Sequence, residues 1–236
     1  GNHYILNGTK SFITNAKEAD IAIVFAVTNK DVKKSLSISA FIVDMSLEGV
    51  TIGKIEDKLG IKGSSSCSII FNNVKVHKSC LLGELGDGVK IAMATLDGGR
   101  IGIAAQSLGI ATAALNDAIE YSKDRKQFNQ YISQFQTIQF MLAEMATRIE
   151  ASRYLTYNAA FKKQNNENYS VSASMAKLFA SETAGFVSSK AIQIFGGYGY
   201  TSDYNVERYY RDAKITEIYE GTSEIQKMII SKHFLN

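Results

Sequence analysis

One short stretch of the chain combines a carboxylate, a glycine and hydroxyl side chains in an order that could support proton transfer. It covers residues 215–226 and reads ITEIYEGTSEIQ. Gly221 interrupts the chain, and Ser223 with Gln226 three residues later has the spacing of a capping box, which predicts a helix start there. Glu220 then lies in a loop just before that helix. Such a carboxylate either complements the helix dipole or acts as a general base, and its spacing does not separate the two roles.

Two other patterns also have more than one interpretation. Asp97 and Arg100 are three residues apart, the spacing of an ordinary ion pair on a helix. Gly196 and Gly197 follow a helical pattern, so they either end that helix or allow the backbone to approach a ligand closely. They are not a dinucleotide-binding fingerprint of the βαβ type, because that fingerprint follows a strand.

Composition excludes several classes of protein. With 236 residues and 45% hydrophobic residues, the chain has enough apolar material to fold. The net charge of +3 comes without a cluster of Lys and Arg, which argues against nucleic-acid binding. The sequence contains no run of about 18 apolar residues, so it predicts no membrane-spanning helix. Two cysteines and three histidines without ligand spacing predict no metal site and no disulfide framework, as in a reducing compartment. A di-iron bundle is excluded because no Glu-x-x-His pair occurs.

The first part of the chain, residues 1–83, has the pattern of an antiparallel β domain. Short runs rich in Ile, Val and Phe alternate with turn residues, and Asn7-Gly8 between two runs predicts a hairpin. We expect a barrel or sandwich. The predicted strands cover residues 3–6, 11–14, 21–27, 37–43, 50–55, 68–71 and 74–76.

The second part, residues 84–236, has helical periodicity. Leu108, Ala111, Leu115 and Ala118, for example, fall on one face of a helix. Long helices with apolar stripes and short connections predict an antiparallel bundle of the four-helix type, so the fold class is α+β with two domains. The predicted helices cover residues 87–124, 133–163, 170–195, 205–213 and 222–235.

Five motifs, in this order along the chain, resemble those of the acyl-CoA dehydrogenases, flavoenzymes of fatty-acid and amino-acid oxidation. The likeness extends over essentially the whole chain and is nearest to the short-chain, butyryl-CoA type. In this family an N-terminal helical domain and the first β strands precede the part matched here, so we expect this chain to be part of a longer protein. The motifs are GTKSFITN (8–15), LGIKGSSSC (59–67), RKQF with FQ (125–128 and 135–136), QIFGG (193–197) and the stretch 215–226.

The resemblance assigns catalytic and substrate roles. It implies that Glu220 removes the α-proton of an acyl-CoA thioester while the β-hydrogen leaves as hydride to flavin N5, which gives the trans-2-enoyl-CoA. Asp97, Arg100 and Gly221 are then expected to contact the substrate. Some relatives carry the base directly before the arginine of the first bundle helix. Here Gly99 stands at that position, which leaves Glu220 as the base.

The resemblance also implies FAD as cofactor. The segment beginning at Phe12 packs on the isoalloxazine ring in the family, and Arg125 meets the pyrophosphate of a neighbouring subunit's FAD. The family usually has tryptophan where this chain has Phe12. The implied FAD-binding residues are Phe12, Ile13, Thr14, Arg125, Phe128, Gln136, Gln193, Gly196, Gly197, Thr222, Ser223 and Glu224.

Family members are typically homotetramers that pass electrons to electron-transfer flavoprotein, so we expect both partners here, together with an acyl-CoA substrate. Neither nucleic acid nor membrane insertion is expected. The implied compartment is the cytoplasm in a bacterium and the mitochondrial matrix in a eukaryote. The alternatives are an acyl-CoA oxidase-like or electron-bifurcating relative, and a truncated assembly protein that keeps the bundle without catalysis. The fragment on its own could then be inactive.

Overall fold

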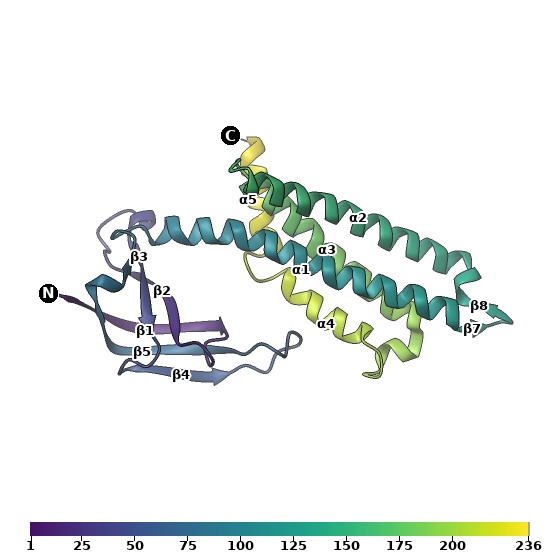
Figure 1. Ribbon diagram of the computed structural model, residues 1–236, viewed down its shortest axis with the longest axis horizontal. Coiled ribbons are helices and arrows are strands. Elements are labelled where there is room, and N and C mark those ends of the chain that lie inside the picture. Colours follow the sequence, from purple (N-terminus) through teal and green to yellow (C-terminus); the bar gives the residue numbers. More distant parts are fainter. Residues whose placement is uncertain (236) are drawn as a thin grey trace. The chain divides into compact units, whose positions relative to one another are not determined.

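The computed structural model describes residues 1–235 and consists of strands followed by helices, which confirms the predicted fold class (Figure 1). The chain divides into two compact units, one formed by Gly1–Thr95 and the other by the residues from Leu96 on. Among the described residues, no helix has both the length and the apolar character that crossing a membrane requires.

The first unit contains two small antiparallel sheets. Alternate side chains of the strands point inward and form a core that includes Leu6, Val24, Phe41, Val43 and Val74. The two sheets have the orders β1-β5-β4 and β2-β3-β6. Their strands are β1 (His3–Thr14), β2 (Ile21–Val27), β3 (Ile38–Asp44), β4 (Val50–Ile55), β5 (Ser66–His77) and β6 (Leu81–Leu82).

The hairpin predicted at Asn7-Gly8 is wrong, because β1 continues through both residues. The ladder between β1 and β5 has an irregularity between Leu6 and Gly8. Gly8, at φ +138°, accommodates this bulge. The Asn7 side chain accepts a hydrogen bond from the backbone N–H of Asn73 at 2.8 Å, so it stabilises strand pairing instead of a turn. The two runs predicted at 68–71 and 74–76 are likewise one strand, β5.

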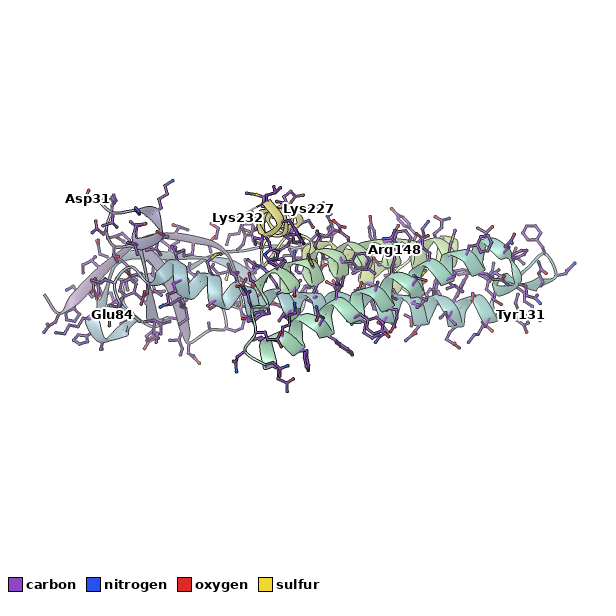
Figure 2. The ribbon with its side chains drawn as sticks, turned by 90° about the horizontal axis from the view of Figure 1, so that it is seen from above. Asp31, Glu84, Tyr131, Arg148, Lys227 and Lys232 are labelled. Carbon is purple, nitrogen blue, oxygen red and sulfur yellow. The ribbon has the colours of Figure 1, made fainter. Side chains whose placement is uncertain are left out.

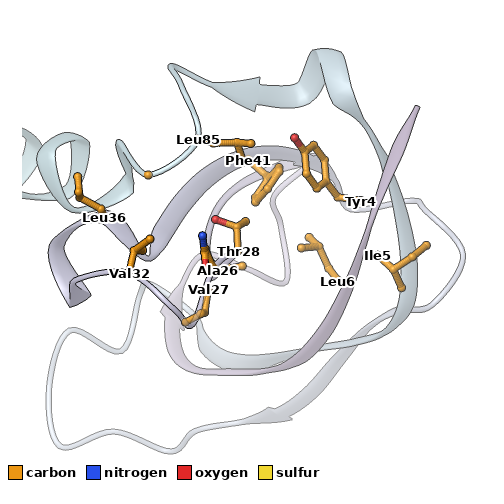
Figure 3. Close-up of a pocket in the computed structure, with 12 residues that line it drawn as sticks. Tyr4, Ile5, Leu6, Ala26, Val27, Thr28, Val32, Leu36, Phe41 and Leu85 are labelled. Atoms are coloured by element: carbon orange, nitrogen blue, oxygen red, sulfur yellow. The ribbon is translucent and has the colours of Figure 1, made fainter. Parts of the chain in front are cut away.

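A cavity of about 550 Å³ lies within the first unit (Figure 3). Its walls are mainly apolar and include Leu6, Val27, Phe41 and Leu85. No carboxylate, imidazole, ammonium or thiol lines it, and none of the site residues expected from the sequence does so. The cavity therefore offers no acid, base or nucleophile of those kinds for catalysis.

The second unit is a helical bundle in which α3 is central and contacts α2, α4 and α5 (Figure 1). The predicted stripe Leu108, Ala111, Leu115 and Ala118 is buried in its core together with residues of α2 and α3. A two-stranded hairpin of β7 (Lys126–Gln127) and β8 (Gln130–Tyr131) follows the first helix. The helices are α1 (Gly88–Asp124), α2 (Gln136–Gln164), α3 (Ser170–Phe195), α4 (Val206–Thr216) and α5 (Ser223–Leu235).

Small side chains allow α3 to lie close to its neighbours. Ala176, Ala180, Ala184 and Ala191 are fully buried along this helix. Close approach of backbones increases the number of dispersion contacts that each turn of the helix makes. One charged residue, Lys177, is buried among these alanines.

Gly49 provides a test of the first unit's packing. It has φ +89°, and a Cβ there would overlap the carbonyl oxygen of Asn72 and lie 3.2 Å from Cγ2 of Val74. We expect Gly49→Ala to lower the free energy of unfolding by about 2 kcal/mol, because both the backbone conformation and the space exclude a side chain. Gly63→Ala is the control, since no atom lies within 4 Å of its Cβ position. Urea unfolding measures both variants, and equal midpoints would contradict the prediction.

Candidate active site

Glu220 lies in the loop between α4 and α5 with its backbone in the left-handed region, at φ +54°. The loop closes where the N–H of Ser223 donates to the carbonyl of Glu217 at 3.0 Å. A left-handed conformation costs a residue with a side chain of order 1 kcal/mol or more, so the surrounding structure must enforce it. The Glu220 side chain is half-buried.

Two buried side chains hold this loop by its carbonyl groups. The Nε2 of Gln226, a fully buried residue of α5, donates to the carbonyl of Gly221 at 2.9 Å and to that of Glu220 at 3.3 Å. The Nζ of Lys177 on α3 donates to the same Gly221 carbonyl at 2.8 Å. The peptide groups next to Glu220 are therefore fixed from two helices.

The capping box predicted for Ser223 and Gln226 does not form. Thr222 caps α5 instead, since its Oγ1 accepts a hydrogen bond from the N–H of Ile225 at 3.4 Å. Gln226 is engaged with the two loop carbonyls, which are acceptors that need a donor. The hydroxyl of Ser223 is buried without a hydrogen-bond partner in the described structure.

Gly99 on α1 faces the carboxylate of Glu220. A Cβ at this position would overlap Oε2 of Glu220 and lie 3.0 Å from its Cδ. The missing side chain at residue 99 thus leaves the space that the carboxylate occupies. Residue 99 and Glu220, the two positions that the resemblance connects with a base, are therefore adjacent in space.

Asp97 and Arg100 form an ion pair next to this position, and the pair is more buried than an ordinary helical surface pair. Arg100 is only 2% exposed. Asp97 also accepts a hydrogen bond from the hydroxyl of Ser170 at 3.0 Å. Within residues 1–235, the Nε of Arg100 has no hydrogen-bond partner, so its N–H is available as a donor to a ligand.

Sequence reasoning missed Lys177. Burial lowers the pKa of its ammonium group to about 8, against the attraction of Glu217 and Glu220, which raise the pKa. The sequence did contain a signal, because Lys177 follows Ala173 and precedes Ala180 on the face that carries the small residues of α3. A charge on such a stripe is expensive to bury and therefore calls for a specific partner.

A second group of predicted residues lies at the other end of the bundle. Arg125, Gly196 and Gly197 line a cavity of about 480 Å³ together with Tyr121 and Tyr198. A Cβ built on Gly197 would meet no atom within 4 Å, so the packing of this chain does not require glycine there. A guanidinium beside open glycine backbone suits a large anion such as a dinucleotide pyrophosphate. The expected cofactor therefore fits these residues.

The two groups cannot belong to one pocket of one chain. Arg100 and Asp124 are 24 residues apart on α1, which corresponds to about 36 Å of helix. Figure 2 shows Tyr131 of β8 at one end of the bundle and Lys227 of α5 far from it. The family resemblance implies that Arg125 meets the FAD of a neighbouring subunit, and this separation is compatible with that expectation.

Phe12 and Phe128 share an unusual conformation. Phe12 lies at a bulge of β1 with φ +56°, and Phe128 lies in the turn of the β7–β8 hairpin with φ +52°. Their side chains are 74% and 86% exposed. An aromatic ring held in solvent by a strained backbone is a feature of a binding surface.

The other predicted cofactor residues lie near element ends. Ile13 and Thr14 pair with β5 opposite Cys67 and Ser66. The exposed Gln136 opens α2, and the exposed Gln193 lies in the last turn of α3. Hydrogen bonds from its own backbone N–H and from the Thr222 hydroxyl lower the pKa of Glu224 at the start of α5. In the described part of the chain, no three His, Cys, Asp or Glu side chains gather as metal ligands.

Comparison with known proteins connects both units to one family. The family model of the acyl-CoA dehydrogenase middle domain matches residues 1–74, and that of the C-terminal domain matches residues 86–235. The short-chain specific acyl-CoA dehydrogenase of Clostridium acetobutylicum is 53% identical over 231 residues, which are 98% of this chain and 61% of that protein. The chain thus spans about three fifths of the length of such relatives.

Solved structures give the same result. Butyryl-CoA dehydrogenase from Megasphaera elsdenii matches with a TM-score of 0.97 and 54% identity, over 99% of this chain and 61% of that one. A chain from a structure described as the electron transferring flavoprotein of Acidaminococcus fermentans, studied for flavin-based electron bifurcation, matches with a TM-score of 0.98. The two chains are 55% identical, and the match covers 100% of this chain and 62% of that one. The chain belongs to the acyl-CoA dehydrogenase family, whose members depend on FAD.

Proposed function

We propose that the protein containing this chain catalyses FAD-dependent α,β-dehydrogenation of a short-chain acyl-CoA to the trans-2-enoyl-CoA, with Glu220 as the base. The observation that carries this proposal is the position of Glu220, strained at φ +54°, clamped by its flanking carbonyls and facing the space left by Gly99. An isolated dipole-complementing carboxylate would need none of these constraints.

The chemistry explains why the carboxylate must be fixed. A proton next to a thioester carbonyl is weakly acidic, so its removal requires a base held in the attacking position. Gln226 holds the carbonyl groups of Glu220 and Gly221, and Lys177 holds that of Gly221. FAD, when bound, accepts the hydride from the β-carbon. A backbone N–H of the base polarises the thioester carbonyl in this proposal, as an oxyanion-hole donor does.

Asp97 and Arg100 lie beside Gly99 on α1 and are proposed to contact the CoA portion of the substrate. The buried guanidinium with an unpartnered Nε is a donor available to a phosphate or a carbonyl. The name of the relative from Clostridium acetobutylicum favours a short acyl chain, as does the match to butyryl-CoA dehydrogenase.

We further propose that each cofactor site is completed by a second copy of this chain. Arg125, Gly196 and Gly197 lie about 36 Å along the bundle from Arg100, a separation too great for residues of one catalytic pocket. With Phe128 and Gln136, this group would bind the FAD whose ring faces the neighbouring chain's Glu220. A homotetramer satisfies this arrangement, and closed symmetry is the common form of such assemblies.

Electron-transfer flavoprotein is the proposed acceptor of the electrons. The match to a chain from a study of that flavoprotein supports this partner, and it also favours a second candidate function in an electron-bifurcating system. Catalysis at Glu220 is shared by both functions, and they differ in where the electrons go. The compartment follows the source, cytoplasm in a bacterium and mitochondrial matrix in a eukaryote.

The role of Glu220 can be tested by anaerobic titration of the FAD-loaded protein, which should be yellow, with butyryl-CoA. The native protein should bleach, and Glu220→Gln should keep its visible flavin spectrum while its reduction rate falls at least about 100-fold, because the base is lost. Glu217→Gln is the control, since its carboxylate also faces Lys177 but pairs with Lys214 at 2.6 Å. Equal rates for Glu220→Gln and the native protein would contradict the assignment.

The space at Gly99 gives a second test. Gly99→Ala should reduce the rate of flavin reduction by about 10- to 100-fold, because the new methyl group displaces the Glu220 carboxylate. Gly102→Ala, one turn further along α1, meets no atom within 4 Å and should leave the rate unchanged. Stopped-flow spectroscopy measures both variants, and an unchanged rate for Gly99→Ala would contradict the proposed geometry.

Sharing of sites between chains predicts complementation. Glu220→Gln and Arg125→Ala should each be inactive alone, but co-expression should restore activity in on the order of a quarter of the sites, because mixed assemblies contain some sites with both residues intact. Co-expression of Glu220→Gln with Gly99→Ala is the control, since both changes affect the same group. No recovery in the first pair would contradict a shared site.

A further inference from the structure

We propose that Lys177 is a positioning residue, which holds the carbonyl of Gly221 and so keeps Glu220 aimed at its substrate. The inference rests on the proposed function, because it explains how the base is prepared for its reaction. Lys177 contacts the backbone of the loop that carries Glu220, so it acts through Glu220.

The contact between Lys177 and the loop joins residues far apart in the sequence. The Lys177 Nζ, from the middle of α3, donates to the Gly221 carbonyl at 2.8 Å, and its side chain is fully buried. That carbonyl already has a donor in Gln226 Nε2 at 2.9 Å. Satisfying the carbonyl alone therefore does not require Lys177.

Packing does not require Lys177 either. A methionine has a similar volume and no charge to desolvate, so it would fill the same space at lower cost. A buried ammonium that neither packing nor hydrogen-bond satisfaction demands must serve through its charge and its direction. Both act on the peptide group that follows Glu220.

The charges around Lys177 come from four elements. Glu217 at the end of α4, Glu220 in the loop and Glu224 on α5 attract the ammonium group, while Arg100 on α1 repels it. Burial lowers the Lys177 pKa to about 8, so the group is cationic at neutral pH and loses its charge above that value.

Lys177 thus has two effects that can be separated by experiment. The hydrogen bond fixes the direction of Glu220 and should set the maximal rate of flavin reduction. The charge strengthens that hydrogen bond, so the maximal rate should fall as Lys177 loses its proton above about pH 8. Binding of butyryl-CoA depends on neither effect.

The test uses Lys177→Met, the conservative Lys177→Arg, and Lys190→Met as a control on the same helix. Stopped-flow reduction by butyryl-CoA is measured from about pH 5.5 to 9. Lys177→Met should lower the maximal rate by about 10- to 100-fold and abolish the decline above about pH 8. Lys177→Arg, which stays charged, should restore most of the rate and keep it above pH 8, and the concentration of butyryl-CoA giving half-maximal rate should be unchanged in all variants.

A second readout needs no flavin. The pKa of Lys177 is lower in the folded protein than in the unfolded chain. At pH values between the two pKa values, the unfolded chain binds one more proton than the folded protein. The free energy of unfolding therefore rises with pH in this range. Between pH 7.5 and pH 9.5 this group should raise the equilibrium constant for folding by about 20-fold. Lys177→Met should lose this increment, and Lys190→Met should keep it, in urea unfolding followed by helical circular dichroism.

The outcomes distinguish a failure of the proposed function from a failure of the positioning role of Lys177. If the native protein binds FAD but no acyl-CoA reduces it, the proposed function fails and the role of Lys177 fails with it. If the native protein is reduced and Lys177→Met keeps the native rate at every pH, only the positioning role is overturned. A lower rate for Lys177→Met, in a native protein whose rate does not decline above pH 8, would overturn the effect of the charge and leave the effect of the hydrogen bond.

Discussion

The carbonyl oxygen of Gly221 accepts hydrogen bonds from two buried side chains, and much of the second unit is arranged to make this possible. Lys177 reaches it only because the small residues of α3 let that helix lie close to its neighbours. Gln226 reaches it only because α5 starts at Ser223 and is capped by Thr222. These two contacts hold the residue that follows Glu220, whose own backbone is in the left-handed region at φ +54°. Local strain is thus balanced by interactions from elements distant in the sequence.

The parts of the fold that follow from periodicity were predictable from the sequence. The helix predicted at 170–195 has those ends in the structure, and the strands predicted at 21–27 and 50–55 do as well. These elements have a uniform pattern along their whole length, so local information is sufficient. Asn7-Gly8 was misleading because a bulge and a tight turn use the same residue types, and only the partner strand decides between them.

For the candidate site, the sequence indicated which side chains carry chemistry but not how they are held. Glu220 stood out because a glycine and a helix start follow it. Lys177 did not, since its partner is a backbone carbonyl 44 residues away that no motif marks. The separation of Arg125 from Arg100 could be predicted, because the helix expected at 87–124 connects them and fixes their distance along its axis. Backbone strain, by contrast, was invisible, although Phe12, Phe128 and Glu220 all have positive φ.

The segment of α1 between Arg100 and Asp124 fixes the distance between the two groups of site residues in the proposed assembly. An α-helix turns by about 100° and rises about 1.5 Å with each residue, so inserting or deleting one residue would rotate one end group away from its site. Changes of about 7 or 11 residues nearly restore the rotation but shift the spacing by more than 10 Å. Both the phase and the length of this segment are therefore constrained, even at positions where the side chain itself is free to vary. Loop insertions elsewhere carry no such double constraint, so this stretch of helix should be the least tolerant of changes in length.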